Sequence, residues 1–258
     1  MNWIPLLWLA VTLALLLLAE RWIHRHMQGT MLLLTGDREL AVMLYALPLL
    51  PGIVLHELSH AFVATLLGVQ VGRISIRPKL ANKRIQLGFI PVEKTDVVRA
   101  SLIGLAPLLI GSLVILLIGY LAFGIGMLGT ALAAGSWNHL FTEFRKMLRD
   151  IPRAPDIWVW AYVIFAVSNT MMPSRSDRQA WTPVILFLLL IGVLIWVSGL
   201  GPAVAESVAP FAAAPLTTAL YWLTAMYTFT ILADLPFILL IALVEGLLGY
   251  MKGMRVEY

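Results

Sequence analysis

The sequence contains an H-E-x-x-H pentapeptide, His56-Glu57-Leu58-Ser59-His60, whose spacing is that of a zinc site on a helix. On an α-helix, residues four apart lie on the same face, so the two imidazoles could share one metal ion. Zinc held by three protein ligands keeps a fourth position for water, lowers the pKa of that water, and leaves Glu57 to take its proton. The pattern therefore predicts a hydrolytic zinc centre that needs a third protein ligand.

The surroundings of this motif are strongly apolar. Between Glu39 and Gly68, the only other ionisable side chain is that of Tyr45. Ionisable groups at membrane depth are costly and usually functional. The whole chain of 258 residues is 60% hydrophobic and 12% charged, with a mean hydropathy of +0.90, which exceeds what soluble domains carry. We therefore expect an integral, multi-pass membrane protein whose solvent is the lipid bilayer.

Composition also limits the ligands and the partners. The chain has no cysteine, which excludes disulfides and thiolate ligands and leaves His, Asp and Glu to bind a metal. The net charge is +4, and no basic patch is interleaved with aromatic residues. This charge fits loops that face anionic lipid, and we expect no nucleic-acid partner.

Long apolar runs predict an all-α polytopic membrane protein with about six transmembrane helices. The first run is interpreted as a retained helix, because no basic region precedes it and no cleavage site follows it. Residues 20–39 are predicted to form a loop, and Pro48 and Pro51 predict a kink before the zinc motif. The six predicted spans are 3–19, 40–67, 97–123, 157–172, 183–200 and 215–248.

The polar stretch after the second span has the pattern of strands. Ile74 and Ile76 alternate with polar residues, and Ile85, Leu87 and Phe89 alternate in the same way. This period of two predicts a small membrane-associated β-hairpin or sheet directly after the zinc-motif helix. Its open edge could hold an extended peptide through backbone hydrogen bonds, although an ordinary structural hairpin has the same pattern.

Three residues are candidates for the third zinc ligand. His139 and Glu143 lie four apart in segment 137–151, whose apolar residues recur at helical spacing as in an interfacial amphipathic helix. Asp177 follows the fourth predicted span. Because the second and fourth spans run towards the same membrane face, Asp177 can reach the two histidines of the motif. More Lys and Arg residues lie on that face, which predicts that it is cytoplasmic and that the site lies nearer to it.

These motifs together resemble the site-2 protease family of intramembrane zinc metalloproteases. That family has an H-E-x-x-H helix, a small membrane-associated sheet after it, and a later helix that ends in an asparagine followed eight residues on by an aspartate. Asn169 and Asp177 have this spacing here. The resemblance implies that His56, His60 and Asp177 bind Zn2+, that Glu57 activates water, and that Asn169 positions the substrate or the developing oxyanion.

The chain departs from the family pattern around the proposed aspartate ligand. The family has N-x-x-P and L-D-G, whereas Pro173 lies four residues after Asn169, and Ser176-Asp177-Arg178 replaces the second motif. Arg178 could pair with Asp177 and compete with the metal. The resemblance covers residues 40–181 of what we interpret as one membrane domain, 1–258.

The expected function is hydrolysis of peptide bonds within or near transmembrane segments of membrane-protein substrates. The alternative is a non-proteolytic site-2-protease-like membrane protein that serves as a binding or assembly partner. A transporter is disfavoured, because Asp234 and Glu245 are the main charged residues in the spans outside these motifs. For these two residues we expect polar contacts with neighbouring helices.

Overall fold

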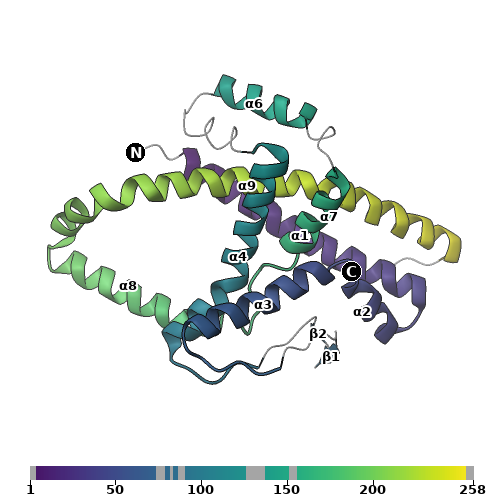
Figure 1. Cartoon of the computed structure of the whole chain (residues 1–258), viewed down its shortest axis with the longest axis horizontal. Coiled ribbons are helices and arrows are strands. Elements are labelled where there is room, and N and C mark those ends of the chain that lie inside the picture. The colour runs from purple at the N-terminus through teal and green to yellow at the C-terminus, as the bar shows by residue number, and fades with distance from the viewer. Residues whose placement is uncertain are drawn as a thin grey trace.

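The computed structural model describes residues 4–73, 79–81, 84–86, 91–125, 137–150 and 156–253. These residues form mainly α-helices, arranged as in Figure 1. The elements are α1 (Ile4–Thr35), α2 (Arg38–Ala46), α3 (Leu50–Leu66), β1 (Lys79–Ala81), β2 (Arg84–Gln86), α4 (Val97–Phe123), α6 (Trp137–Asp150), α7 (Ile157–Ser168), α8 (Trp181–Val197) and α9 (Gly201–Lys252).

The structure supports an all-α membrane protein but not six spans. Within the described residues, three helices are long and apolar enough to cross a membrane: α1, α4 and α9. The bent pair of α2 and α3 would make a fourth if it counts as one span. With 12 residues, α7 is only about 18 Å long, which is shorter than the hydrocarbon layer of about 30 Å.

α1 and the second half of α9 lie side by side and run in the same direction. His26 Nδ1 lies 2.5 Å from Glu245 Oε2, and seven residues further along both helices Lys252 Nζ donates to the Leu33 carbonyl. In an alternating layout of six spans, the first and sixth would run in opposite directions. The parallel pair therefore provides a physical reason why six spans are not supported.

The predicted loop over residues 20–39 is wrong for most of its length, because α1 continues as a helix to Thr35. Its polar residues have partners on other helices. His24 Nδ1 lies 2.5 Å from the hydroxyl of Tyr45 on α2, and His26 pairs with Glu245 on α9. The arginines of the same segment, Arg21 and Arg25, are exposed. The helix can continue because its histidines have partners on neighbouring helices and its arginines are exposed.

The predicted kink before the zinc motif is confirmed. α2 and α3 are bent by 76° at the break that contains Pro48. Pro51 lies in the first turn of α3, where its missing N–H costs no helical hydrogen bond. On α3, the buried residues Ile53, Glu57, His60 and Ala64 recur at helical spacing. The zinc motif therefore lies on a helix whose buried face packs on the rest of the protein.

The structure does not support the predicted hairpin or sheet after α3 beyond one short antiparallel pair of strands. The described residues contain only two strands of three residues each, and β1 pairs antiparallel with β2. A single bridge joins Val71 to Val92. Most of the alternating segment 74–90 lies outside the described residues.

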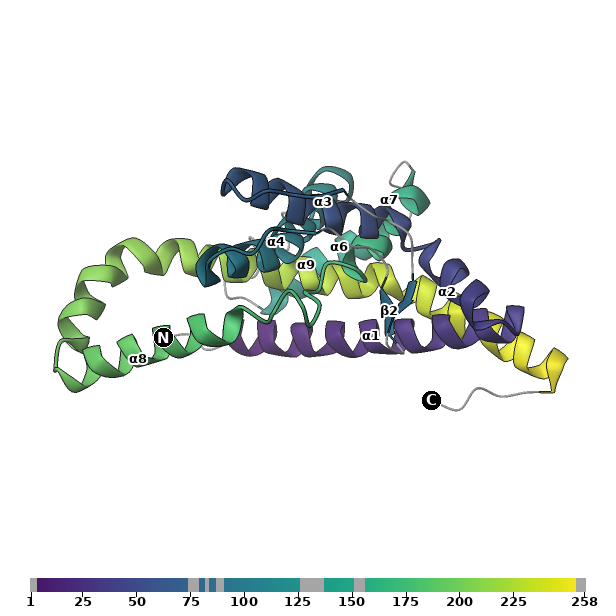
Figure 2. The same cartoon turned by 90° about the horizontal axis from the view of Figure 1, so that it is seen from below.

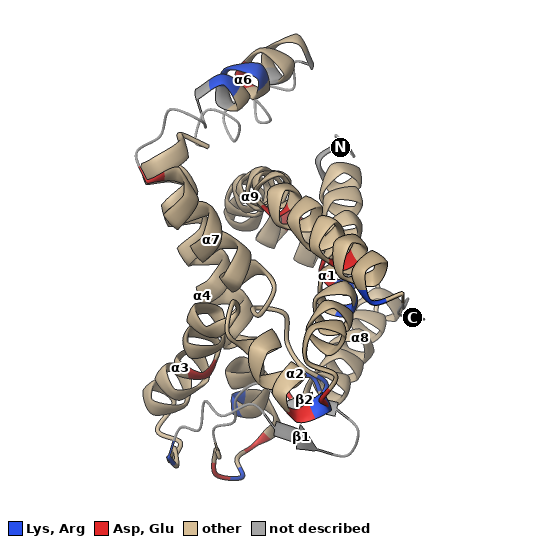
Figure 3. Ribbon diagram, turned by 90° about the vertical axis from the view of Figure 1, so that its right-hand side faces the viewer, with Lys and Arg blue, Asp and Glu red and all other residues tan. Residues whose placement is uncertain are grey.

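α4 and α7 run antiparallel, and glycines on α4 allow it to approach the turn that follows α7 closely. A Cβ on Gly111 would lie 2.7 Å from the Met171 Cβ, and one on Gly104 would lie 2.1 Å from the Asp177 carbonyl oxygen. Figure 3 shows the positively charged α6 at one end of this pair. The loop that carries Asp177 lies at the opposite end, near the start of α4.

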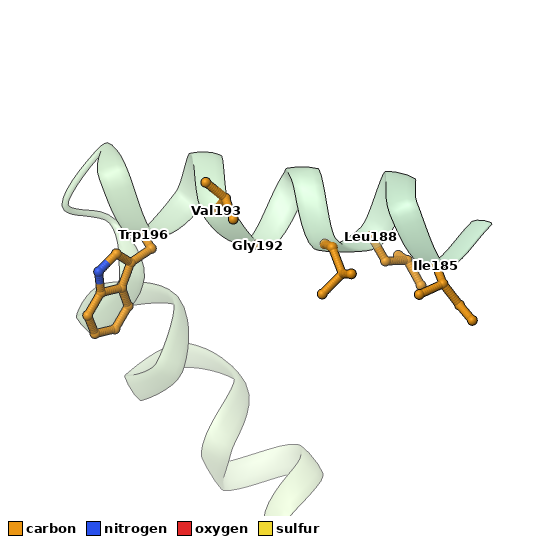
Figure 4. A pocket seen from close by; sticks show the side chains of 6 residues that line it. Ile185, Leu188, Gly192, Val193 and Trp196 are labelled. Atoms are coloured by element: carbon orange, nitrogen blue, oxygen red, sulfur yellow. The ribbon is translucent and has the colours of Figure 1, made fainter. Parts of the chain in front are cut away.

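α8 and the first half of α9 extend away from the other helices (Figure 2). Along α8, a shallow hollow is lined by the apolar side chains drawn in Figure 4, among them Leu188 and Trp196. It contains no group that could perform acid–base or metal chemistry. An apolar surface of this kind is what a helix facing lipid presents.

Candidate metal centre

Two histidines on α3, His56 and His60, direct their Nε2 atoms towards the same place, because their Nδ1 atoms are held by backbone carbonyls. His56 Nδ1 lies 2.6 Å from the Thr170 carbonyl oxygen, and His60 Nδ1 lies 2.8 Å from the Ile103 carbonyl oxygen. A carbonyl only accepts, so each Nδ1 must carry the hydrogen. In the neutral imidazoles, each Nε2 is then left with a free lone pair. Backbone carbonyls in this role fix the tautomer and the orientation of metal-binding histidines.

The two Nε2 atoms face each other at 3.1 Å. The Asp177 carboxylate closes the group, with Oδ1 at 3.5 Å from His60 Nε2 and Oδ2 at 3.7 Å from His56 Nε2. Their side chains are only 10% to 15% exposed. Acceptor atoms of three side chains therefore converge in a mostly buried place, which is favourable only if a cation or a proton lies among them.

The distances fit a tetrahedral ion. Ligand atoms that lie about 2.0–2.1 Å from zinc in a tetrahedron are about 3.3–3.4 Å from one another. The observed Nε2–Nε2 separation is 3.1 Å, slightly shorter than that value, and the two nitrogen–oxygen separations, 3.5 Å to Oδ1 and 3.7 Å to Oδ2 of Asp177, are slightly longer. The group His56, His60 and Asp177 could thus hold a metal ion. Two imidazoles and one carboxylate are a donor set that zinc accepts while one position stays open.

The turn after α7 holds the Asp177 carboxylate in place. The backbone N–H of Ser174 donates to Asp177 Oδ2 at 2.7 Å, and the N–H of Asp177 donates to Ser174 Oγ at 3.3 Å. Burial opposes ionisation of this carboxyl, but the neighbouring imidazoles of His56 and His60 and the hydrogen bonds from Ser174 outweigh it and lower its pKa to about 2. Asp177 is therefore a carboxylate at neutral pH, the form that binds metals.

Contacts with α4 and α3 place this turn against the histidines. Gly104 lies directly against the Asp177 backbone, and Ser101 Oγ donates to the Ala180 carbonyl at 2.9 Å. On the other side, a Cβ on Gly52 would lie 2.0 Å from the Ala166 carbonyl oxygen, so only glycine lets α3 approach α7 this closely. Three helices thus set the distance between the histidines and the aspartate.

Glu57 lies on the same helix, between the two histidines in sequence. Glu57 is buried, with 7% of its surface exposed. His56 and Asp177 are ionisable groups close enough to interact with it. A carboxylate in this place is suited to take a proton from a water molecule bound at the metal ligands.

Asn169 is the C-cap of α7 and is 2% exposed. Its Nδ2 donates to the Phe165 carbonyl at 2.8 Å and lies 3.2 Å from Ser168 Oγ. Its Oδ1 is buried and has no hydrogen-bond partner in the described part of the chain. An oxyanion role needs a donor, whereas in this arrangement the amide offers an acceptor.

The rival ligands and the neighbouring arginine do not join the group. His139 and Glu143 are on α6, at the other end of the α4–α7 pair, where Glu143 Oε1 accepts from Lys146 at 2.7 Å. Arg178 is exposed, and its Nε donates to the Ser174 carbonyl at 3.3 Å. Among the described residues, no ion pair within 4.0 Å joins Arg178 to Asp177, so the expected competition with the metal is not seen.

Some residues of the site could not be found from the motif alone. The Ile103 and Thr170 groups that orient the histidines are backbone carbonyls, which any residue type provides. Gly104 stands out in the sequence only as a small residue in an apolar helix. Its contact with Asp177 needs the three-dimensional structure.

Comparison of the chain with protein-family models, with curated proteins and with solved structures found no match. We therefore base the function on the geometry of these residues.

Proposed function

We propose that the protein is an intramembrane zinc metalloprotease of the site-2 protease type. It would hydrolyse peptide bonds within or near the transmembrane segments of membrane-protein substrates. The observation that carries this proposal is the convergence of His56, His60 and Asp177, with a buried glutamate beside them. Such a set of groups is typical of zinc hydrolases.

Zinc suits the ligand set. His56 Nε2, His60 Nε2 and one Asp177 oxygen would hold it, and the chain has no cysteine to favour softer metals. When bound, zinc would polarise the scissile carbonyl and lower the pKa of a water molecule.

The protein groups would perform the proton transfers and hold the substrate. Glu57 would take a proton from the attacking water and later give it to the nitrogen of the leaving chain, as a general base and then a general acid. Asn169 Oδ1, which is buried and without a partner among the described residues, would accept a hydrogen bond from a backbone N–H of the substrate. Asn169 would thereby position the substrate.

The position of the site along α4 supports cleavage at membrane depth. Ile103, whose carbonyl holds His60, is six residues, or about 9 Å, from the start of α4. If α4 spans, its 27 residues measure about 40 Å against a hydrocarbon layer of about 30 Å. The metal would then lie just inside one membrane face, where water can reach it. We propose a multi-pass topology with this face on the cytoplasmic side, because basic residues lie near it. Lys94 and Arg99 flank the start of α4, and Arg175 and Arg178 lie in the turn that carries Asp177.

A Glu57→Gln variant tests the proposal. In co-expression or in proteoliposomes with a panel of membrane-protein substrates, we expect wild type to cleave and Glu57→Gln to be slower by about 100- to 10,000-fold. Glu206→Gln, which changes an exposed glutamate on α9, is the matched control and should cleave like wild type. Zinc content should be equal in all three. If wild type and Glu57→Gln leave every substrate equally uncut while zinc stays bound, the protein is a non-proteolytic binding or assembly partner.

A further inference from the structure

A chain of buried polar side chains connects α9 to the end of α7. Asp234 on α9 is 1% exposed, and its Oδ1 lies 3.3 Å from Ser168 Oγ. Ser168 Oγ in turn lies 3.2 Å from Asn169 Nδ2. Ser168 and Asn169 are each 2% exposed. Three polar side chains from two helices therefore contact one another away from solvent.

The position of Asp234 needs a reason. Removing a carboxyl from water is unfavourable unless it is hydrogen-bonded, and an ionisable side chain inside a membrane helix usually marks a functional site. The residues before and after it on α9 are apolar, and several nearby members of the same helix, such as Phe229, belong to the main hydrophobic core. Leucine at position 234 would be buried in these apolar surroundings without the cost of removing a carboxyl group from water. The contact between Asp234 and Ser168 therefore needs a role that offsets this cost.

The end of α7 is where this contact can affect the metal ligands. Asn169 Nδ2 bonds the Phe165 carbonyl, and Thr170 Oγ1 bonds the Ala166 carbonyl at 2.8 Å, so side chains hold the last helical turn closed. The next group along the backbone, the Thr170 carbonyl, receives the hydrogen of His56 Nδ1 at 2.6 Å. A rotation of this turn would move the acceptor that orients His56.

We infer that Asp234 is a positioning residue for the metal centre. By accepting from Ser168, it fixes the last turn of α7 from a second helix, and thereby sets the Asn169 amide and the Thr170 carbonyl that orients His56. This inference extends the proposed function and depends only on its metal site, because the role of Asp234 does not require that the bound metal hydrolyses peptides.

The test is metal binding by the purified full-length protein in lipid nanodiscs. We compare Asp234→Leu and Asp234→Asn with wild type, measuring zinc affinity by competition with a chelator and ligand geometry by the visible spectrum of the Co2+-substituted protein. Asp234→Leu is expected to weaken zinc binding by about 3- to 10-fold, below the 10- to 100-fold typical of a direct partner of a metal ligand, and to shift the Co2+ bands. Asp234→Asn keeps an oxygen that can accept from Ser168, so it should match wild type.

Two further variants separate positioning from general packing. Thr230→Val changes a fully buried polar residue one turn earlier on α9, whose hydroxyl, within the described part of the chain, bonds only the Met226 carbonyl of its own helix. It should leave zinc affinity and the Co2+ spectrum unchanged. Ser168→Ala removes the same contact from the α7 side, together with the contacts of Ser168 Oγ with the Phe165 carbonyl and Asn169 Nδ2. It should therefore weaken zinc binding at least as much as Asp234→Leu, and adding Asp234→Leu to it should have no further effect.

Two outcomes would overturn the inference. One is an Asp234→Leu or Ser168→Ala protein that is folded and has wild-type zinc affinity and spectrum. The other is an Asp234→Asn protein as impaired as Asp234→Leu. Failure of the proposed function is distinguishable, because wild type would then bind zinc and respond to Asp234→Leu as described, yet cleave no substrate.

Discussion

Gly104 controls the distance between α4 and the Asp177 backbone, and adding one methyl group there should disable the metal centre. A Cβ at position 104 would lie 2.1 Å from the Asp177 carbonyl oxygen, whereas ordinary van der Waals contact begins at 3.4 Å. In Gly104→Ala, the two segments must therefore separate by about 1.3 Å. The obstacle is backbone, so no side-chain rotation can relieve it.

A separation of that size is large compared with what a zinc site tolerates. Ligand distances must lie within about 0.2 Å of their usual values, so Asp177 would no longer close the group with His56 and His60. We expect Gly104→Ala to weaken zinc binding by at least about 100-fold, since outer-shell changes alone cost 10- to 100-fold.

The assay is zinc affinity by chelator competition, with circular dichroism as a measure of helix content. Gly192→Ala is the matched control, because it makes the same substitution in an apolar helix, α8, at a position where a Cβ meets nothing within 4 Å. It should bind zinc as wild type does. A folded Gly104→Ala protein with wild-type zinc affinity would refute the claim that this contact places Asp177.

Two other predictions concern stability. Removing the metal with a chelator should lower the thermal unfolding midpoint, and added zinc should restore the midpoint. The reason is that a ligand that binds only the folded state stabilises that state by about 2.7 kcal/mol at a free ligand concentration 100 times its Kd. An unchanged midpoint would contradict a metal bound to the folded protein. Asp37→Ala should cost about 1 kcal/mol of unfolding free energy without changing zinc affinity, because Asp37 Oδ1 caps α2 by accepting from the N–H groups of Glu39 and Leu40. Denaturant titration checks this second prediction, and an unchanged free energy would show that the cap contributes nothing.

The sequence predicted which residues come together in this chain better than it predicted the path of the helices. The H-E-x-x-H motif, the apolar setting and the distant Asp177 could be found because residue type and spacing carry that information. The kink at Pro48 was equally readable, because a proline in the interior of a helix removes a backbone hydrogen bond.

The path of α1 shows what spacing alone misses. Its polar second half was interpreted as a loop, since charged residues usually mark the end of a span. The structure continues the helix because His24 and His26 find partners on α2 and α9, which are distant in sequence. Contacts between segments that are distant in sequence therefore determine that α1 continues as a helix. The same contacts hold α1 and the second half of α9 parallel.

The fourth predicted span differs for a related reason. The run from 157 to 172 is apolar enough for a span, but the helix ends at Ser168, where the Asn169 side chain and backbone close its last turn. The residues after it are then free to bring Asp177 back towards α3. The sequence gives no sign of this early end except the asparagine itself.

The most direct test of the account is the zinc content of the purified protein and of Asp177→Ala, with Glu143→Ala as the control for the rival ligand on α6. We expect about one zinc per chain in wild type and in Glu143→Ala, and little zinc in Asp177→Ala after dialysis against a weak chelator. Full zinc occupancy in Asp177→Ala would contradict the assignment of Asp177 as the third ligand.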